Sequence, residues 1–483
     1  MMYKLAGCEP QRVFEIFEEI SNVPRCTYHI EGITAHCIEF AEKLGLPVRK
    51  DEAGNVIITK PGTEGYESSE PVILQGHLDM VAEKLPESTH DFLSEGIELY
   101  VEDGFVRAKG TTLGGDNGIA VAMAMAVLES KTIAHPPIIA IFTADEEEGM
   151  SGAEGLDFSQ IPSRKVLNMD SEAEGIITAG CAGGIQNDTV MTIARETVSG
   201  IKFTLSVSGL SGGHSGMTIH EQRGNAIIII TRMLTELRKA FGIKVVDITG
   251  GSKNNVIPSG CVATFVVEEE KIADIQKMVE NLEKEIRYEF AGEEAGMTFE
   301  LTVDNVVEAS AITDESVLPV LTYVMTCPNG VIAWNRKLKG VVETSVSIGI
   351  ITTEGTEARM VHLIRSSVES EKELLYKQMT MLAEGLGGKS VRNSDYPAWQ
   401  FAVQSELRDV ASVAFEKCYG HAPEISVVHC GLECGIFTGH QPDLDCISFG
   451  PDILDVHSTN EHLDIASVER TWKFLVQILE DLK

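Results

Sequence analysis

The stretch "IFTADEEEGM", residues 141–150, carries four consecutive carboxylates, Asp145 to Glu148, directly after an apolar run. The run, 138–142, predicts a buried strand, so the acids stand at its carboxyl end. A buried carboxylate stays ionised only beside compensating positive charge. That charge must come from elsewhere in the chain, and a pair of divalent cations would supply it.

Histidine and aspartate follow another predicted strand. "LQGHLDM" places His77 after an apolar run, with Asp79 two residues on. A histidine at a strand end can ligate a metal through one ring nitrogen, while a nearby carboxylate fixes the tautomer from the other. The alternative is a strand-end histidine beside a surface aspartate.

Three further motifs follow the same pattern. Asp116 lies between glycines in "GTTLGGDNG", before a helix rich in small residues, where it either caps the helix or is aimed inward by a strained turn. Asp170 ends a strand in "LNMDSEAEG", and His457 follows one in "DVHSTNEHL". Each is unremarkable alone, but ligands collect at the carboxyl ends of strands in open α/β sheets.

The joint set of His, Asp, Glu, Asp and His suits zinc, and Mn²⁺ or Co²⁺ also fit. A competing zinc motif is formed by Cys430 and Cys434 beside His429, although no second pair with ligand spacing accompanies them.

The motifs "GHLDM", "GTTLGGDNG", "TADEEEGM", "NMDSE" and "VHSTNEHL" resemble those of the dinuclear metallopeptidases that include carnosinases, aminoacylases, tripeptidase T and glutamate carboxypeptidases. With "HCGLECG" and a long insertion, the chain is most similar to the bacterial aminoacyl-histidine dipeptidases. The resemblance covers nearly the whole chain.

The resemblance implies two divalent metal ions, about 3.5–4 Å apart as in other two-metal hydrolases. Asp116 would bridge them and precede a cis peptide to Asn117. The other roles implied are His77 and Asp170 on one metal, Glu147 and His457 on the second, and Asp79 orienting His77.

Within "ADEEEG" the family pattern makes Glu146 the general base and Glu147 the ligand. The metals would activate a bridging water, and Glu146 would move its proton to the leaving amine. Three consecutive glutamates leave the register open, because Glu147 and Glu148 could be the working pair instead.

The insertion carries "GLSGGHSGM", where the resemblance implies that His214 stabilises the oxyanion of the tetrahedral intermediate. The insertion is long enough to form a lid of two ferredoxin-like units, which could supply His214 within one chain. In the relatives that the resemblance points to, a lid with a single such unit donates this histidine across a dimer. Three further substrate contacts are expected, although surface roles remain open for each: Asn255, Arg365, which suits a terminal carboxylate, and Glu433, which suits a free amine.

The elements that position these residues fall into two sets. Up to about residue 187, helical spacing alternates with apolar strand-like runs, and this character returns after about 395. From 188 the pattern becomes strand, helix, strand, strand, helix, twice, and the second copy begins with a strand at 298–306. We therefore expect a three-layer α/β/α catalytic domain with a central mixed sheet, 1–187 and 395–483, and an inserted α+β lid of two ferredoxin-like halves, 188–394.

Composition narrows the setting of this chemistry. The 483 residues carry a net charge of −34, which disfavours nucleic acid as a partner. The sequence shows no apolar run of membrane-spanning length and no signal core, and its ten cysteines have no framework spacing, so a cytoplasmic location is expected.

The resemblance, together with the ligand set, implies a zinc-type metallodipeptidase that is a monomer or a homodimer. The substrates expected are unblocked dipeptides, with Xaa-His substrates such as β-alanyl-histidine among them. An N-acyl amino acid deacylase or a tripeptidase would use the same ligands, and a catalytically silent binding protein is the alternative outside the enzyme class.

Overall fold

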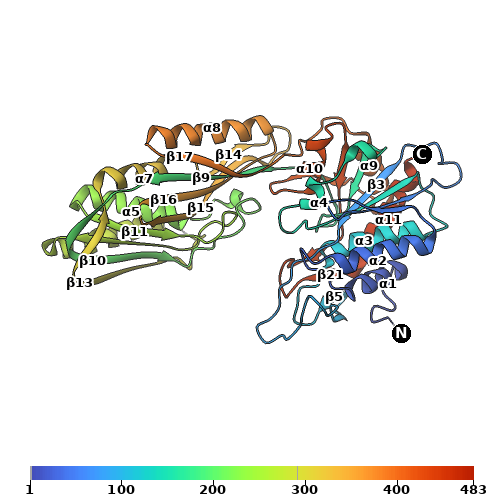
Figure 1. Ribbon diagram of the computed structural model, residues 1–483, viewed down its shortest axis with the longest axis horizontal. Coiled ribbons are helices and arrows are strands. Elements are labelled where there is room, and N and C mark those ends of the chain that lie inside the picture. Colours follow the sequence, from blue (N-terminus) through green and yellow to red (C-terminus); the bar gives the residue numbers. More distant parts are fainter. Residues whose placement is uncertain (1–2, 291) are drawn as a thin grey trace. The chain divides into compact units, whose positions relative to one another are not determined.

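The computed structural model describes residues 3–290 and 292–483, which form two compact units (Figure 1). Unit 1 holds the described residues up to Gly180 together with Phe401–Val427 and Leu432–Lys483. Unit 2 holds Cys181–Gln400 and Val428–Gly431. Each unit has its own hydrophobic core.

An eight-stranded mixed sheet forms the centre of unit 1. In spatial order its strands are β1 (Val48–Lys50), β2 (Val56–Lys60), β6 (Ile138–Thr143), β3 (Val72–His77), β7 (Lys165–Asn168), β19 (Asp445–Ser448), β8 (Ile176–Cys181) and β18 (Glu424–Val428). The four central strands β6, β3, β7 and β19 are parallel, so their carboxyl ends share one edge. Every residue of β3 and β6 is buried, as their continuous apolar sequences predict for strands covered on both faces.

Helices pack around this sheet. They are α1 (Gln11–Ser21), α2 (Glu31–Leu44), α3 (Gly115–Glu129), α4 (Ser151–Glu154), α9 (Glu406–Tyr419), α10 (Glu433–His440) and α11 (Ile465–Asp481). Helix α3 is apolar all round and is buried from Gly115 to Leu128, because it lies between β3 and α1. None of the helices among the described residues is both long and apolar enough to cross a membrane.

A smaller antiparallel sheet of unit 1 flanks two of the predicted site segments. Its order is β20 (Ile453–Leu454), β21 (His462–Asp464), β5 (Phe105–Ala108) and β4 (Leu99–Glu102). The loop from β20 to β21 contains His457, and the segment after β5 leads into the glycine-rich turn before α3. This sheet therefore anchors both segments.

Unit 2 is built on one nine-stranded sheet. Its main path is β13 (Thr298–Ile312), β10 (Arg195–Ser208), β12 (Cys261–Val267), β11 (Lys244–Gly250), β15 (Val342–Glu354), β16 (Glu357–Ser366), β9 (Gly183–Thr192) and β17 (Lys389–Tyr396), and β14 (Gly330–Trp334) pairs with β15. The helices of this unit are α5 (Ala226–Phe241), α6 (Ile272–Glu289), α7 (Asp314–Thr326) and α8 (Glu369–Gly385).

The two ferredoxin-like halves expected from the sequence are present, but they are nested rather than consecutive. Strand β13, expected to open the second half, pairs with β10 along its length and closes the first half. The second half takes β9 as its first strand, because β9 pairs with both β16 and β17. The first half is thus inserted between the first strand of the second half and its helix α7.

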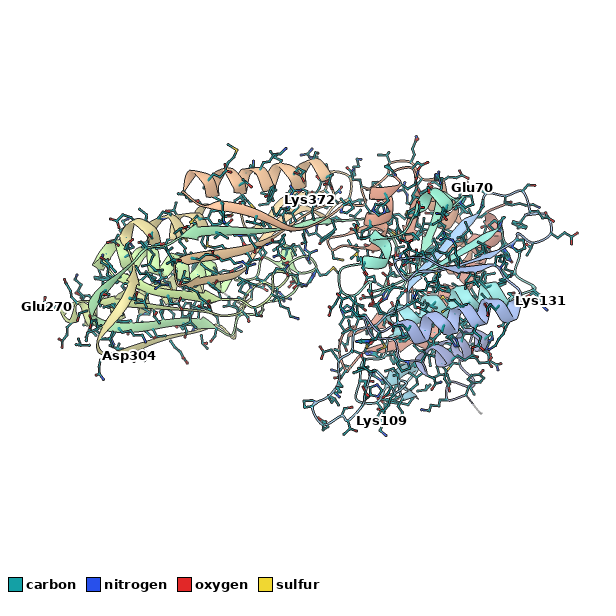
Figure 2. All side chains as sticks on the ribbon, viewed as in Figure 1. Glu70, Lys109, Lys131, Glu270, Asp304 and Lys372 are labelled. Atoms are coloured by element: carbon teal, nitrogen blue, oxygen red, sulfur yellow. The ribbon has the colours of Figure 1, made fainter. Side chains whose placement is uncertain are left out.

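Strand β17 was not expected from the sequence, because its residues are polar and largely exposed. It is held against α8 by Lys372, which Figure 2 labels on that helix. The buried ammonium donates to the carbonyl of Tyr396 and to Asp395, both in β17.

The domain boundaries placed at 187/188 and 394/395 fall inside β9 and β17. These strands pair with each other, so they belong to the same unit, and the division between units lies instead at Gly180/Cys181 and Gln400/Phe401. Sequence alternation could not locate it, because β8 and β9 follow one another as strands with only Ala182 between them.

Candidate metal centre

His77 ends strand β3 and is fully enclosed, with 1% of its surface exposed. Its Nδ1 lies 3.4 Å from Oδ1 of Asp79 and 3.2 Å from the Asp79 carbonyl oxygen. Its Nε2 lies 3.1 Å from Asp116 Oδ1 and 3.5 Å from Asp170 Oδ1. The Asp79 contacts fix the ring orientation and leave Nε2 directed at two carboxylates.

Asp116 stands between two histidines at the start of α3. Its Oδ1 faces His77, and its Oδ2 lies 3.1 Å from Nε2 of His457. The peptide bond from Asp116 to Asn117 is cis, as the family resemblance predicted. A carboxylate that presents one oxygen to each side is placed as a bridging ligand would be.

The three glutamates that follow β6 differ in their contacts and exposure. Glu147 Oε2 lies 3.0 Å from His457 Nε2, and its buried Oε1 has no hydrogen-bond partner among the described residues. Glu146 Oε2 lies 4.0 Å from His77 Nε2, whereas Glu148 is exposed. This geometry favours Glu146–Glu147 as the working pair over Glu147–Glu148.

Asp79 also holds this acidic run in place. Its Oδ1 accepts from the backbone N–H of Glu146 at 2.9 Å, and its Oδ2 accepts from that of Glu147 at 3.2 Å. Thr27 Oγ1 donates to Oδ2 at 2.9 Å. One buried carboxylate therefore orients both a histidine on β3 and the glutamates after β6.

Two groups of ligating atoms overlap at Asp116. One group is His77, Asp116 and Asp170, and the other is Asp116, Glu147 and His457. Within each group the ligating atoms lie within 4.8 Å of one another. These two groups contain the five residues predicted from the sequence as ligands, divided as the resemblance implied, and a third group joins Glu146 to His77 and Glu147. No such group among the described residues includes Cys430 or Cys434.

The carboxylates of this cluster shift the pKa values of one another and of the two histidines upward, with Asp116 as the exception. Burial lowers the pKa of His77, but Asp170 and Asp116 raise it well above its ordinary value. Hydrogen bonds to Asp116 and Glu147 raise the pKa of His457 to about 11. Burial raises the pKa of Asp170 to about 6 and that of Glu146 well above its ordinary value. These shifts show that the buried carboxylates favour positive charge beside them.

Divalent cations fit this cluster. The two ligand groups offer imidazole nitrogens and carboxylate oxygens, and the unpaired buried Oε1 of Glu147 is a donor atom without another partner among the described residues. Zn²⁺, Mn²⁺ and Co²⁺ all accept this donor set. The cations would replace the protons on His77 and His457 as the source of positive charge.

Unit 2 brings together three predicted residues that are far apart in sequence. Arg365, on β16, has Nη2 3.3 Å from Nε2 of His214 and donates from Nη1 to the Tyr396 hydroxyl. The backbone carbonyl of Asn255 accepts from Ser215, the neighbour of His214.

His214 is held as a neutral donor. Its Nδ1 accepts from the N–H groups of Gly216 and Met217, so its ring proton stands on Nε2. Burial and Arg365 lower the pKa of His214 to about 4. His214 Nε2 and the Arg365 guanidinium therefore present N–H groups side by side, which suit an anionic acceptor that contacts both.

Glu433, at the start of α10, is 0% exposed. Its Oε2 accepts from the Gln75 amide and from the Thr143 hydroxyl, and Asn168 donates to Gln75 in turn. These partners belong to β3, β6 and β7, the strands that precede the ligands. Burial raises the pKa of Glu433 to about 8.

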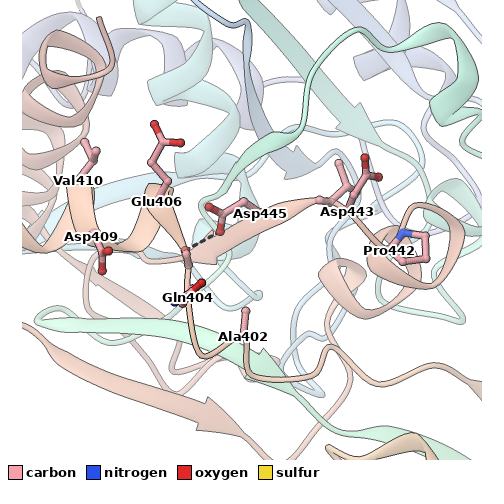
Figure 3. A pocket seen from close by; sticks show the side chains of 10 residues that line it. Ala402, Gln404, Glu406, Asp409, Val410, Pro442, Asp443 and Asp445 are labelled. Atoms are coloured by element: carbon pink, nitrogen blue, oxygen red, sulfur yellow. Dashed lines mark hydrogen bonds between the residues drawn. The ribbon is translucent and has the colours of Figure 1, made fainter.

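A separate pocket of about 650 Å³ lies at the start of α9 (Figure 3). Its lining residues are Ala402, Gln404, Ser405, Glu406, Asp409, Val410, Pro442, Asp443, Leu444 and Asp445. Asp445 accepts from the Ser405 hydroxyl, drawn dashed in Figure 3, and from the N–H of Leu407. Its acidic residues include this helix-capping carboxylate, and it contains none of the predicted site residues.

Sequence reasoning missed several residues that hold the centre. Arg25 donates to the carbonyls of Leu78, Asp79 and Gly114, and Glu461 accepts from the turn that carries Asp116. Arg25 has no pattern around it that predicts burial. Glu461 lies in the quoted motif "VHSTNEHL", four residues after His457, and its position in that motif was the available signal.

Comparisons with known proteins place this geometry in a family. Residues 205–294 match the peptidase dimerisation domain, and residues 252–481 match the model of peptidase family M20/M25/M40. The cytosol non-specific dipeptidase of Escherichia coli (strain K12) is 35% identical over 484 residues, which cover 100% of this chain and 99% of the relative. The chain belongs to the M20/M25/M40 peptidase family. The predicted family resemblance is thereby confirmed, and the protein is a peptidase.

Solved structures agree on the fold. The aminoacylhistidine dipeptidase from Vibrio alginolyticus has a TM-score of 0.90 at 35% identity, with 99% of this chain and 98% of that chain covered. A tripeptidase from Staphylococcus aureus has a TM-score of 0.57 at 16% identity, with 98% and 99% covered, and shares the fold alone. The predicted α/β catalytic fold with a lid of two halves is confirmed.

Proposed function

We propose that the chain is a metallodipeptidase that hydrolyses the peptide bond of unblocked dipeptides, including Xaa-His dipeptides such as β-alanyl-histidine. The observation that carries this proposal is the pair of ligand groups that share Asp116, with Glu146 beside them. The full-length similarity to a dipeptidase supports the choice of substrate class.

In this proposal His77 and Asp170 would hold one cation, Glu147 and His457 would hold the second, and Asp116 would be shared by both. Two divalent cations would supply an acidified water and an electrophile for the substrate carbonyl. Zinc is the proposed metal, because the ligands are imidazole and carboxylate, and Mn²⁺ or Co²⁺ are the alternatives.

Glu146 acts as the general base. It stands next to the ligand Glu147 in the chain, and its Oε2 faces His77. Burial and neighbouring acids raise its pKa well above the ordinary value, so it can accept a proton from the attacking water and hold it. The same carboxyl group then delivers that proton to the leaving amine.

The residues of unit 2 serve the substrate. We propose that His214 donates to the oxyanion of the tetrahedral intermediate and that Arg365 binds the terminal carboxylate. The pair of adjacent donors supports both roles. Asn255 is proposed as a further substrate contact on the resemblance.

Glu433 has two possible roles that one variant separates. If Glu433 binds the substrate amine, for which its carboxylate is suited, Glu433→Gln raises KM and leaves metal affinity unchanged. Its burial and its ties to Gln75 and Thr143 support a different role beneath the ligand-bearing strands, in which case metal affinity falls and KM does not rise.

The experiment that tests the proposed function combines one variant with a substrate panel. Glu146→Ala is expected to retain its metals and lose turnover by 10²-fold or more, on the order of the effect of a general base. Wild-type rates in this variant would refute the base assignment. If the chain is instead a catalytically silent binding protein, the wild type also shows no turnover.

The panel consists of β-alanyl-histidine, an N-acetyl amino acid and a tripeptide. The proposal predicts the highest kcat/KM for the dipeptide. A higher value for the N-acetyl amino acid identifies a deacylase, and a higher value for the tripeptide identifies a tripeptidase.

The setting of the enzyme is also proposed. A cytoplasmic location is supported by the similarity to a relative described as a cytosol dipeptidase. The match to a peptidase dimerisation domain supports a homodimer, with a monomer as the alternative. The net charge of −34 supports a small peptide rather than a nucleic acid as the partner.

A further inference from the structure

The turn that carries Asp116 is held by a buried carboxylate from another part of unit 1. Glu461 Oε2 accepts from the N–H groups of Leu113 and Gly114 at 2.7 and 3.0 Å. Its Oε1 accepts from those of Gly115 and Asp116 at 2.8 and 3.3 Å. Four successive backbone donors at the start of α3 thus converge on one side chain that is 4% exposed. An anion at a helix start satisfies donors that have no partner within the helix.

The opposite side of the same turn is held by Arg25. Its fully buried guanidinium donates from Nη2 to the Gly114 carbonyl and from Nη1 to the carbonyls of Leu78 and Asp79 at 3.0 Å. Arg25 therefore joins the turn before α3 to the segment that follows β3. Arg25 thus contacts a carbonyl group of the turn, and Glu461 contacts its N–H groups.

Two of the three glycines in "LGGDNG", Gly114 and Gly115, are explained by these contacts. A Cβ on Gly114 would lie 2.5 Å from Arg25 Nη2, and the residue has φ +68°, which L side chains rarely adopt. A Cβ on Gly115 would lie 3.3 Å from Glu461 Oε1. The absence of side chains lets both charged groups reach the backbone.

Glu461 shares its loop with a proposed ligand. His457 lies four residues earlier, and the N–H of Glu461 donates to the Ser458 carbonyl, which closes the loop into a turn. One short segment therefore presents His457 to Asp116 Oδ2 and, through Glu461, holds the backbone from which Asp116 projects. The position of Asp116 relative to His457 therefore depends on this one segment.

We propose that Glu461 is a positioning residue that fixes the bridging carboxylate Asp116 relative to His457 and so sets the metal affinity of the centre. This inference rests on the proposed function, because it assumes that Asp116 bridges two cations. Residues that orient metal ligands typically contribute 10–100-fold to metal affinity. Glu461 would do so through the backbone of its ligand rather than through the side chain.

The test measures Zn²⁺ affinity of the full-length metal-free protein by competition with a chromogenic chelator. Glu461→Gln puts an amide NH₂ against two backbone N–H donors and removes the charge, so Zn²⁺ affinity should fall about 10–100-fold. Glu461→Asp keeps the charge but shortens the side chain by one methylene. Zn²⁺ affinity should fall less in this variant than in Glu461→Gln. The Asp variant takes the place of the Gln variant in the test if the Gln variant does not fold.

Glu294 provides the matched control, because it makes the same kind of contact in unit 2. It is 4% exposed and accepts from the N–H groups of Ser211 and Gly224 at 2.6 and 2.7 Å. Glu294→Gln should lower thermal stability while leaving Zn²⁺ affinity within about twofold of the wild type, a margin small beside the effect of a ligand-orienting residue.

Wild-type Zn²⁺ affinity in Glu461→Gln, or an equal loss of affinity in Glu294→Gln, would overturn the inference. A wild-type chain that binds no Zn²⁺, Mn²⁺ or Co²⁺ would instead overturn the proposed metal centre itself. The two failures are distinguished by the wild-type titration, which is carried out first.

Discussion

The replacement Asp79→Asn tests how the histidine and the acidic run are held together. Asp79 is 0% exposed, and its two oxygens accept from Glu146, Glu147 and Thr27 while Oδ1 faces the His77 ring. An asparagine keeps one acceptor oxygen and turns the other into a donor. With its oxygen in the Oδ1 position that faces His77, it loses the two bonds that Oδ2 accepts from Glu147 and Thr27, and it loses the charge.

The magnitude follows from those contacts. Hydrogen bonds to charged groups contribute about 1.5–3 kcal/mol each, so the loss of two lowers the free energy of unfolding of the metal-free protein by about 3 kcal/mol or more. Loss of the ligand-orienting group lowers Zn²⁺ affinity by about 10–100-fold. Thr27→Val removes a single bond to the Asp79 carboxylate and is expected to cost about 1.5 kcal/mol, so the two variants form a graded series.

The assay pairs urea unfolding of the metal-free protein with chelator competition for Zn²⁺. Asp91→Asn is the control, because Asp91 also accepts hydrogen bonds, from Ser94 and Leu93, but lies exposed in a loop. Wild-type Zn²⁺ affinity in Asp79→Asn, together with unchanged unfolding, would refute the orienting role of Asp79.

Three further predictions concern the protonation of histidines and whether His214 acts in its own chain or in a partner chain. Burial lowers the pKa of His362 to about 4, so below pH 6.5 the unfolded chain binds a proton that the folded chain excludes, and stability falls by about 3 kcal/mol between pH 6.5 and 4. Urea unfolding of His362→Gln should show a flatter acid dependence than the exposed control His220→Gln, and an equal slope in both would contradict this. Metal binding must displace the protons on His77 and His457, so a pH-stat should record proton release at pH 7 and Zn²⁺ affinity should rise with pH; affinity that is independent of pH would exclude the charged histidines. Mixing inactive His214→Ala and Glu146→Ala chains should give no activity if His214 serves its own chain, and restored activity would show donation across a dimer.

The residues with chemistry were largely predictable, because five ligand candidates each follow a strand or open a helix. Parallel strands β3, β6 and β7 place their carboxyl ends at one edge, so His77, Glu147 and Asp170 converge once the fold is known. The family pattern predicted the register Glu146–Glu147 of the acidic run, but the three consecutive glutamates by themselves left it open. The register depends on backbone contacts to Asp79, which no local pattern encodes.

The supporting residues were hidden for a different reason. Arg25 and Glu461 contact backbone groups far away in the chain. Any residue type can supply such a backbone partner, so the sequence shows no sign of the contact except where it requires a glycine. The nesting of unit 2 was missed because only strand pairing shows that β13 completes the first half and that β9 opens the second.

The central claim is that one two-cation centre, bridged by Asp116 and served by Glu146, performs the hydrolysis. Its most direct test is dipeptide turnover by the metal-free protein as Zn²⁺ is added in measured equivalents. The account predicts no turnover without metal, and activity that reaches its plateau at about two equivalents per chain, as a bridged pair of cations requires. Full turnover without metal, or a plateau at a single equivalent, would contradict it.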